Sequence, residues 1–456
     1  MGFAWDPTGS AKWSIRAGFG QFYNRDDISL TDGLGGANPP FVGNFKSVNG
    51  NGRLLDNTDP LPACGNIAAN CFGVGLGNAS VGTELTARQP YTLQYNLTVQ
   101  HELWRDTRLE VGYVASRTTN AQSKYDANAV TPANRLAFAE SNGSLTSLKP
   151  YSVINSGNIA VYSYHGHAAY DSLQAAFDTR FQRSLRLALV YTYSKTLSDV
   201  ALRSNNGNGN LILDPFNPDA MYGLATIHRP HIFAANVIYD TPAFHNWNRI
   251  ARAALGDWEI STIVNVSSGT PYTAVVNSFS AAGSGVSDLS GIGLGNGAYR
   301  PNIVAGEPCR NSSFAGFQWV NPKRYTLNGF QLGTVGTAPV GGCLGPGVAR
   351  ADLSISKSVP ITERIKMQFR MDAFNLFNHP QFNNPNNGNT NGYVNIGFSA
   401  VNTVASPAFL DAAKTPTTSL ANAASIANSS PNSVVGQVTA DNQRDRQLQY
   451  SIRITF

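Results

Sequence analysis

Roughly ten segments of about 9–11 residues alternate apolar and polar side chains along this chain, the length with which a tilted strand crosses a bilayer. The clearest is 91–99, in which every odd residue is aromatic or aliphatic and every even one is polar. Successive side chains of a strand point to opposite faces, so each segment would have one apolar and one polar face. The segments are 13–19, 91–99, 109–115, 173–181, 185–193, 233–239, 258–266, 351–355, 365–371 and 448–456.

The connections between these segments are long and short in turn. The long ones are 24–89, 118–169, 197–227, 268–349 and 378–444. The short ones lie near Trp104–Asp106, Arg183–Ser184 and Pro360–Thr362, with one of moderate length at 241–253. Long connections are uncommon in compact soluble domains. Long loops on one side and short turns on the other are typical of outer-membrane barrels. The pattern therefore predicts an all-β, transmembrane antiparallel β-barrel with long extracellular loops and short periplasmic turns. A soluble β-rich adhesin or sandwich is the less favoured alternative.

The last segment carries a second signal. Its apolar side chains share one face of the predicted strand, and the chain closes on an aromatic residue. The final strand of a bacterial outer-membrane barrel looks like this, and its closing phenylalanine is read by the barrel-assembly machinery. We therefore expect an assembly signal in Leu448, Tyr450, Ile452, Ile454 and Phe456.

Aromatic residues fall at the ends of the predicted strands, as the interfacial girdles of membrane barrels do. Those expected at periplasmic ends are Trp13, Trp258 and Phe456, and those at extracellular ends are Tyr23, Tyr91, Tyr191 and Tyr193.

Composition argues against two other classes, nucleic-acid-binding proteins and proteins with transmembrane helices. Charged residues make up only 13% of the 456 residues, and the net charge of +5 is spread along the chain, so nucleic acid is not an expected partner. No run of 18 apolar residues is present, so a transmembrane helix is not predicted.

The four cysteines form two local pairs. Cys64 and Cys71 lie in the first long connection, and Cys309 and Cys343 lie in the fourth. An even count in local pairs predicts disulfides formed in an oxidising compartment. A four-cysteine zinc site is the alternative, but the first pair is not spaced as CxxC and no histidines cluster nearby.

The sequence predicts no catalytic, metal-binding or cofactor-binding residue. The pairs His165/His167 and His228/His231 lack a third ligand, and neither a GxxxxGK[ST] phosphate loop nor a GxSxG elbow occurs. Asn-rich 202–210 and 381–387 suit either sugar binding or hydrated loops. Polar residues expected to face the barrel lumen are Lys366, Gln368, Arg370 and Asp372.

Several stretches resemble a known family. Residues 352–357, 360–364 and 369–380, the last reading FRMDAFNLFNHP, resemble the penultimate strands of TonB-dependent outer-membrane receptors. More narrowly, they resemble the Oar-like group, which carries an N-terminal carboxypeptidase-regulatory-like domain. Residues 170–174, 191–195, 228–233, 256–260 and 268–272 fit the same family, so the resemblance spans Gly2 to Phe456.

The resemblance implies a barrel of about 22 or more strands, of which residues 1–456 would be the C-terminal portion. The signal peptide, N-terminal β-domain, plug and first barrel strands of such receptors are not in this sequence. The implied function is TonB-energised uptake of a large or scarce nutrient, with an oligosaccharide or peptide favoured, in the bacterial outer membrane. Implied partners are outer-membrane lipid, lipopolysaccharide, the assembly machinery, and TonB only through the N-terminal part. The resemblance implies no enzyme activity and leaves the ligand-binding residues unknown.

A self-contained ten-stranded barrel that acts as a protease or passive pore is the alternative. An even strand number near ten is allowed for such barrels. The protease would need acidic residues beside a histidine at the rim, drawn from Asp199, Asp214 and Asp219 with His165 or His228.

Overall fold

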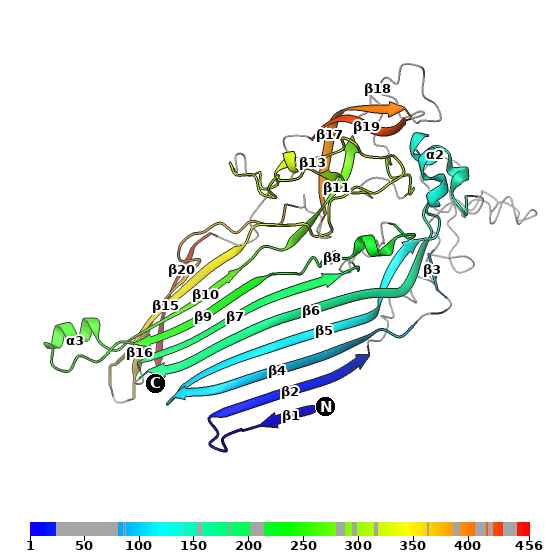
Figure 1. Cartoon of the computed structure of the whole chain (residues 1–456). Helices are drawn as coiled ribbons and strands as arrows, with labels where there is room; N and C mark the ends of the chain where they lie inside the picture. Colours follow the sequence, from blue (N-terminus) through cyan, green and yellow to red (C-terminus); the bar gives the residue numbers. More distant parts are fainter. Residues whose placement is uncertain are drawn as a thin grey trace, which may run out of the picture.

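The computed structural model (Figure 1) describes most of the chain and places it in two regions, a large sheet and a cluster of packed loops at one end of that sheet. The described residues are 1–23, 81–84, 86, 88–141, 143–152, 157–181, 184–200, 214–279, 288–293, 299–313, 318–362, 364–385, 393–405, 416–417, 423–431 and 445–456.

The main sheet contains 13 strands, and its path runs β1-β2-β4-β5-β6-β7-β9-β10-β15-β16-β20 with antiparallel neighbours throughout (Figure 1). Every predicted strand segment lies in this sheet. The strands on the path are β1 (Gly2–Trp5), β2 (Trp13–Tyr23), β4 (Tyr91–Trp104), β5 (Thr107–Asp126), β6 (Ala160–Phe181), β7 (Leu185–Ser198), β9 (His231–Asp240), β10 (Trp258–Ser267), β15 (Val348–Pro360), β16 (Lys366–Phe374) and β20 (Gln447–Thr455).

Three short strands of this sheet depart from the sequence prediction. β1 pairs with β2 and was not expected, because its four residues are too short to show alternation. β3 (Val81–Thr83) pairs with β6 in parallel, and β8 (Gly223–Leu224) pairs with the end of β7. Both lie within connections that the sequence assigns to long loops.

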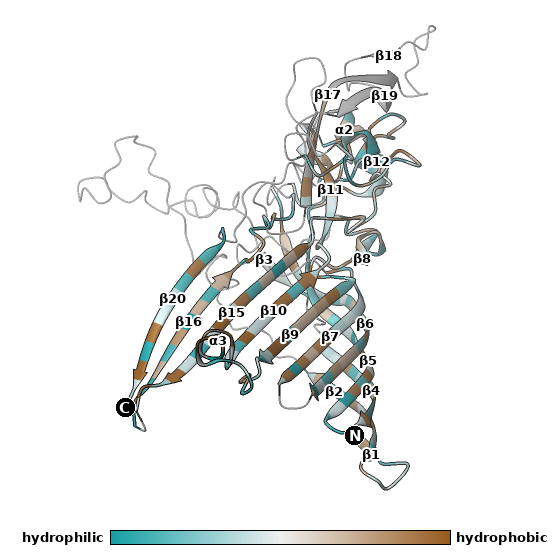
Figure 2. Ribbon diagram, turned by 90° about the vertical axis from the view of Figure 1, so that its left-hand side faces the viewer, coloured by the Kyte–Doolittle hydropathy of each residue, from teal (hydrophilic) through white to brown (hydrophobic). Residues whose placement is uncertain are grey.

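The sheet is curved and open. Among the described residues β1 and β20 form its two edges and are not hydrogen-bonded to each other. The predicted antiparallel order of neighbouring strands is therefore present, whereas the described strands do not close into a barrel. Figure 2 shows hydrophobic and hydrophilic residues alternating along the strands of this curved wall.

The register of the strands joins their apolar positions into one continuous face. Leu97 pairs with Tyr113, which pairs with Leu173 on the next strand. At the other side of the sheet, Met371 pairs with Tyr450. A shift of one residue in any pairing would send a whole apolar row to the opposite face. We refer to this surface as the apolar face and to the opposite surface as the polar face.

Side chains of the apolar face are exposed. Leu97 is 50% exposed, Leu173 51% and Ile452 65%. Soluble monomers rarely expose apolar patches of more than a few hundred Å². A face of this extent fits lipid rather than water.

The long connections at the other end of the strands are not merely loops. They contain a second sheet of order β14-β11-β17-β18 with β19 beside β17, and a two-stranded ladder of β12 and β13. The strands are β11 (Pro271–Phe279), β12 (Asn302–Ile303), β13 (Tyr325–Thr326), β14 (Cys343–Leu344), β17 (Tyr393–Ala405), β18 (Pro416–Thr417) and β19 (Ala423–Pro431). The sequence predicts no strand in these segments.

Short helices complete this end. They are η2 (Pro132–Asn134), α2 (Arg135–Glu140), η3 (Thr146–Leu148), η4 (Pro218–Met221) and η6 (Pro322–Arg324). We define the loop cap as the described residues of 127–159, 268–347 and 379–431, and the rim segment as those of 199–230. Both lie at the long-loop end of the sheet (Figure 1).

The opposite end has tight connections. Asp106 adopts a left-handed φ of +57° in the turn between β4 and β5. Helix α3 (Arg249–Leu255) lies between β9 and β10. Within the part of the chain that the structure describes, no α-helix is both long and apolar enough to cross a membrane.

Candidate functional site

The loop cap is the candidate site because it is the part of the molecule with a packed core of its own. Tyr272, Tyr299 and Phe330 are each 1% exposed, and Val394 and Ile396 are fully buried. These residues come from two connections, and Ala139 of α2 adds a third. Burial of large aromatic side chains is the main source of stability in such a core. The cap is therefore a folded unit and not a set of independent loops.

A disulfide closes the cap. Cys309 and Cys343 are bonded, with their Cα atoms 5.7 Å apart, as the sequence pairing predicts. Cys343 lies in β14 directly opposite Tyr272 of β11. The bond therefore fastens the cap sheet to the segment around Cys309 of the same connection, which has little regular structure. The other predicted pair, Cys64 and Cys71, lies outside the described residues.

A buried ion pair ties the cap to the rim segment. Arg135 of α2 donates two hydrogen bonds to Asp214, at 2.9 and 2.5 Å, and their side chains are 7% and 5% exposed. The guanidinium carbon also lies 5.5 Å from the centre of the Phe216 ring. Gly291, at φ +64°, fits against the backbone of Arg135, where a Cβ would lie 2.0 Å from the carbonyl oxygen. One arginine thus links its own connection to two others.

Two further charged side chains lie inside the cap. Lys149 Nζ donates to the Gly293 carbonyl at 3.1 Å, and burial lowers the pKa of this amine. Asp288 accepts hydrogen bonds from Ser290 Oγ at 2.5 Å and from the Gly293 amide at 2.6 Å. Burial nevertheless raises the pKa of the Asp288 carboxyl. Desolvation thus outweighs the hydrogen bonds at this carboxyl.

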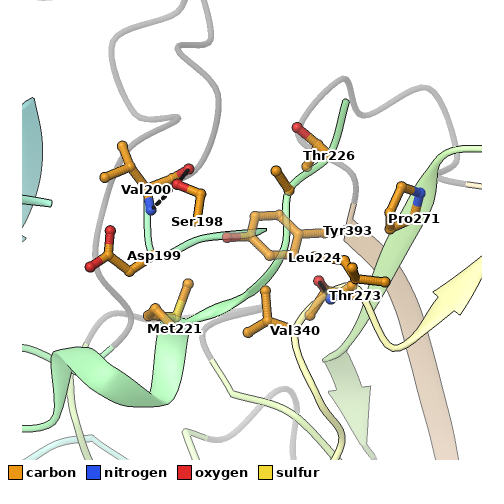
Figure 3. A pocket seen from close by; sticks show the side chains of 12 residues that line it. Ser198, Asp199, Val200, Met221, Leu224, Thr226, Pro271, Thr273, Val340 and Tyr393 are labelled. Carbon is orange, nitrogen blue, oxygen red and sulfur yellow. Dashed lines mark hydrogen bonds between the residues drawn. The ribbon is translucent and has the colours of Figure 1, made fainter. Parts of the chain in front are cut away.

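A small cavity lies where the cap meets the rim segment (Figure 3). Its volume is about 30 Å³, and Figure 3 shows the Tyr393 ring extending from the cap towards Ser198 and Val200. Thr226 Oγ1 is buried there without a hydrogen-bond partner among the described residues. A cavity of about this size holds a water molecule but not a nutrient. This cavity is therefore not a nutrient-binding site.

The predicted protease residues are not brought together. Asp199 lies 3.2 Å from His167, a histidine outside that set, and Asp214 is held by Arg135. His228 is buried, and its Nδ1 accepts a hydrogen bond from the Thr196 amide at 3.2 Å. Asp219 is exposed in η4. This arrangement does not support the protease alternative.

The two remaining histidines of the predicted pairs, His165 and His231, have their polar partners on, or directly after, neighbouring strands. His165 Nε2 lies 3.0 Å from Glu84 Oε2, and His231 Nδ1 hydrogen-bonds with the Tyr191 hydroxyl at 2.7 Å. Across the described ranges, no three His, Cys, Asp or Glu side chains converge as metal ligands. The pairing of His165 with Glu84 was not foreseeable from sequence, because the two residues come from distant segments that meet only through the β3–β6 ladder.

The predicted lumen-facing residues lie on the polar face. In β16, Arg370 is in register with Ser356 and Ser451, and Asp372 with Ser354 and Gln449. Arg370 Nε donates to Asp372 at 2.9 Å. By the same alternation, this face carries the four predicted residues Lys366, Gln368, Arg370 and Asp372.

The terminal residues lie on the opposite, apolar face. Their exposures range from 53% at Leu448 to 97% at Phe456. They form the outer edge of the sheet, where β20 has β16 as its neighbour. The residues are Leu448, Tyr450, Ile452, Ile454 and Phe456.

Comparison with solved structures gives weak overall similarity to much larger chains. The outer membrane transporter YddB from Escherichia coli has a TM-score of 0.40 and 8% identity, over 94% of this chain and 38% of that one. The ferric-catecholate import receptor Fiu from E. coli K12 has a TM-score of 0.37 and 8% identity, over 99% and 34%. The iron transporter FrpB of Neisseria meningitidis has a TM-score of 0.36 and 10% identity, over 83% and 34%. The chain thus spans between 34% and 38% of these three proteins.

Comparison by sequence is more decisive. No curated protein matches the chain. The family described as "outer membrane beta barrel domain" matches residues 1–449, which is nearly the whole sequence. This match agrees with the continuous apolar face and with the antiparallel order of the strands. The chain therefore belongs to the outer membrane β-barrel domain family, and its location is the bacterial outer membrane.

Proposed function

We propose that residues 1–456 form the C-terminal portion of a TonB-dependent receptor of the Oar-like group, which takes up a large or scarce nutrient. The observation that carries this proposal is the combination, in one chain, of a lipid-compatible wall and a folded cap at its long-loop end. The motif resemblance supports it, since its residues 352–360 and 369–374 fall on two neighbouring strands, β15 and β16.

In this proposal the two faces of the sheet contact different environments. The apolar face contacts outer-membrane lipid, and the polar face, with Arg370 and Asp372, faces the lumen of a larger barrel of about 22 or more strands. The open edges β1 and β20 would pair with strands of the rest of the receptor, because unpaired backbone groups are costly in lipid. β20 would also present the assembly signal to the barrel-assembly machinery.

The cap would capture the nutrient outside the cell, next to lipopolysaccharide. Its Arg135–Asp214 pair and its disulfide hold the connections in one arrangement. A rigid platform loses less conformational entropy on binding than mobile loops would. TonB would act through the N-terminal part of the receptor, and this chain would contribute no catalysis.

An oligosaccharide or peptide is the favoured nutrient. Within the described residues of the cap and rim segment, three aromatic side chains are exposed: Tyr151 of the cap is 47% exposed, and Phe216 and Tyr222 of the rim segment are 50% and 46% exposed. Exposed rings offer flat apolar surfaces for sugar rings or peptide side chains, and the tyrosine hydroxyl adds a hydrogen-bonding group.

Uptake of a fluorescent oligosaccharide and peptide panel by the source organism tests this proposal. We expect uptake of one panel member that is lost on deletion of the gene and on deletion of tonB. The double variant Phe216→Ala/Tyr222→Ala should weaken that uptake at least tenfold. The matched control is Trp104→Ala, an exposed aromatic residue in the opposite end of the sheet, which should leave uptake unchanged. Uptake that persists without tonB would contradict the proposal.

A further inference from the structure

Helix α3, at the short-turn end, exposes a cluster of large apolar side chains. Ile250 is 83% exposed, Leu255 53%, and Trp247, just before the helix, 50%. The helix projects beyond the ends of the strands, at the left of Figure 1. The turn at Asp106 also exposes Leu103 and Trp104, at 40% and 52%, but these lie at the end of β4 and not on a helix.

The helix is locally well defined. The Asn248 side chain caps its first turn by accepting a hydrogen bond from the Ala251 amide at 2.7 Å. At its end, the Gly256 amide donates to the Arg252 carbonyl at 3.0 Å. The Phe244 and Trp247 rings stack with their centres 4.5 Å apart. These contacts define the ends of the helix that carries the exposed apolar side chains.

The helix is attached on the side of the apolar face. Trp258 begins β10 and shares a face with Ile260 and Val264. Its indole Nε1 donates to the Ala254 carbonyl of α3 at 2.7 Å. The helix thus continues the surface that meets lipid.

The charges near α3 are divided between the two faces. Lys357 pairs with Trp258 on the apolar face, lies 5.2 Å from its ring and donates to the Gly256 carbonyl at 2.6 Å. Arg252 is exposed on the helix. The acidic residues Asp240 and Glu259 pair with each other on the polar face. A lysine or arginine beside tryptophan and aliphatic side chains suits the headgroup level of a bilayer with anionic lipid.

We propose that α3, together with Trp247, is a membrane-interface anchor. It lies in the headgroup layer of the leaflet at the short-turn end, with Ile250 and Leu255 directed to the acyl boundary and Arg252 to anionic phospholipid headgroups. This proposal rests on the proposed function in one respect, the identification of that leaflet as the periplasmic one. It needs the apolar face to be lipid-facing, and it needs no particular nutrient or energy source.

Fluorescence quenching in liposomes tests the anchor. The full chain is reconstituted into phosphatidylethanolamine with or without phosphatidylglycerol, and carries an NBD label at Ile250→Cys. Leu145→Cys, a 46% exposed residue of the cap, is the aqueous reference, and Leu173→Cys, 51% exposed on the apolar face, is the lipid reference. We expect the label at position 250 to be quenched by lipids carrying a shallow doxyl group and protected from aqueous iodide.

The outcomes separate the anchor from the wall. Iodide quenching at position 250 equal to that at 145, with lipid quenching kept at 173, would overturn the anchor and leave the wall intact. Loss of lipid quenching at both 173 and 250 would overturn both. Arg252→Glu should make lipid quenching at 250 about fivefold weaker with phosphatidylglycerol and unchanged without it. An equal effect in the two lipids would contradict the preference for anionic headgroups.

Discussion

The main sheet and the loop cap are built from similar residues but bury them in opposite ways. On the sheet, Leu173 and Ile452 are more than half exposed, whereas Tyr272 and Phe330 of the cap are almost completely buried. The difference follows from the solvent of each region. A wall surrounded by lipid gains nothing by hiding its apolar side chains, but a cap in water must bury them to fold.

The two regions also hold their backbones differently. The sheet relies on continuous antiparallel ladders, which satisfy the backbone without water. The cap combines short ladders with a buried ion pair, a disulfide and glycines that allow close backbone approach. Changes to specific side-chain contacts should therefore affect the cap more than the wall.

Breaking the buried ion pair should have the largest effect. Asp214→Ala leaves Arg135 buried and unpaired, and such a loss typically costs about 3–5 kcal/mol. Hydrogen exchange should become faster in β11 and α2 and remain unchanged in β4 and β5. The double variant Arg135→Met/Asp214→Leu is the matched control, and should recover most of the stability because no lone charge remains. Equal destabilisation in the single and double variants would contradict this account of the pair.

Removing the cap disulfide should have the next largest effect. Cys309→Ser/Cys343→Ser should destabilise the cap by about 2–4 kcal/mol, because the bond closes a loop of 34 residues. Limited proteolysis should then cut the cap at lower protease concentrations, while the sheet keeps its resistance. Equal loss of protection in both regions would show that the cap and wall unfold together, and would remove the distinction between them.

A charge introduced on the apolar face of the sheet tests the same difference between the sheet and the cap. Leu173→Lys should be destabilising in a bilayer by up to about 2–4 kcal/mol, the cost of a lysine on the lipid face of a barrel. Leu145→Lys, at a similarly exposed position of the cap, should cost almost nothing in water. The measurement is the midpoint of denaturant-induced unfolding in liposomes. A neutral Leu173→Lys would contradict the lipid-facing assignment.

The smallest expected effect concerns pH. Burial raises the pKa of Asp288 above its unfolded value of about 3.9, so the folded cap holds this proton more tightly than the unfolded chain. Cap stability should therefore fall as pH rises from the unfolded pKa through the raised folded one. Asp288→Asn should flatten this part of the stability profile. A profile that is unchanged in the variant would show that the carboxyl is not desolvated.

The strands of the wall were predictable because each has one face in lipid and one in a polar environment, which produces a period of two. β11 of the cap has no such signal. Tyr272, Ala274, Val275 and Val276 are all 3% exposed or less, so both faces of the strand are buried and the alternation disappears. Its parallel partner, β17, is also distant in sequence.

Side-chain partners were less predictable than strands. The cysteines could be paired because Cys309 and Cys343 share one connection. The Arg135–Asp214 contact joins two connections whose relative position depends on the tertiary structure, and neither residue lies in a motif. The interfacial character of α3 was also hidden, since 241–253 reads from sequence only as a connection of moderate length.

Accessibility on intact cells tests the central claim, that the wall spans the outer membrane with the cap outside. A membrane-impermeant maleimide is applied to cells carrying Leu145→Cys in the cap or Ile361→Cys in the turn between β15 and β16, where Ile361 is 54% exposed. We predict labelling at position 145 in intact cells and at 361 only after the outer membrane is permeabilised. Labelling at 361 but not at 145, or at both positions in intact cells, would contradict the account.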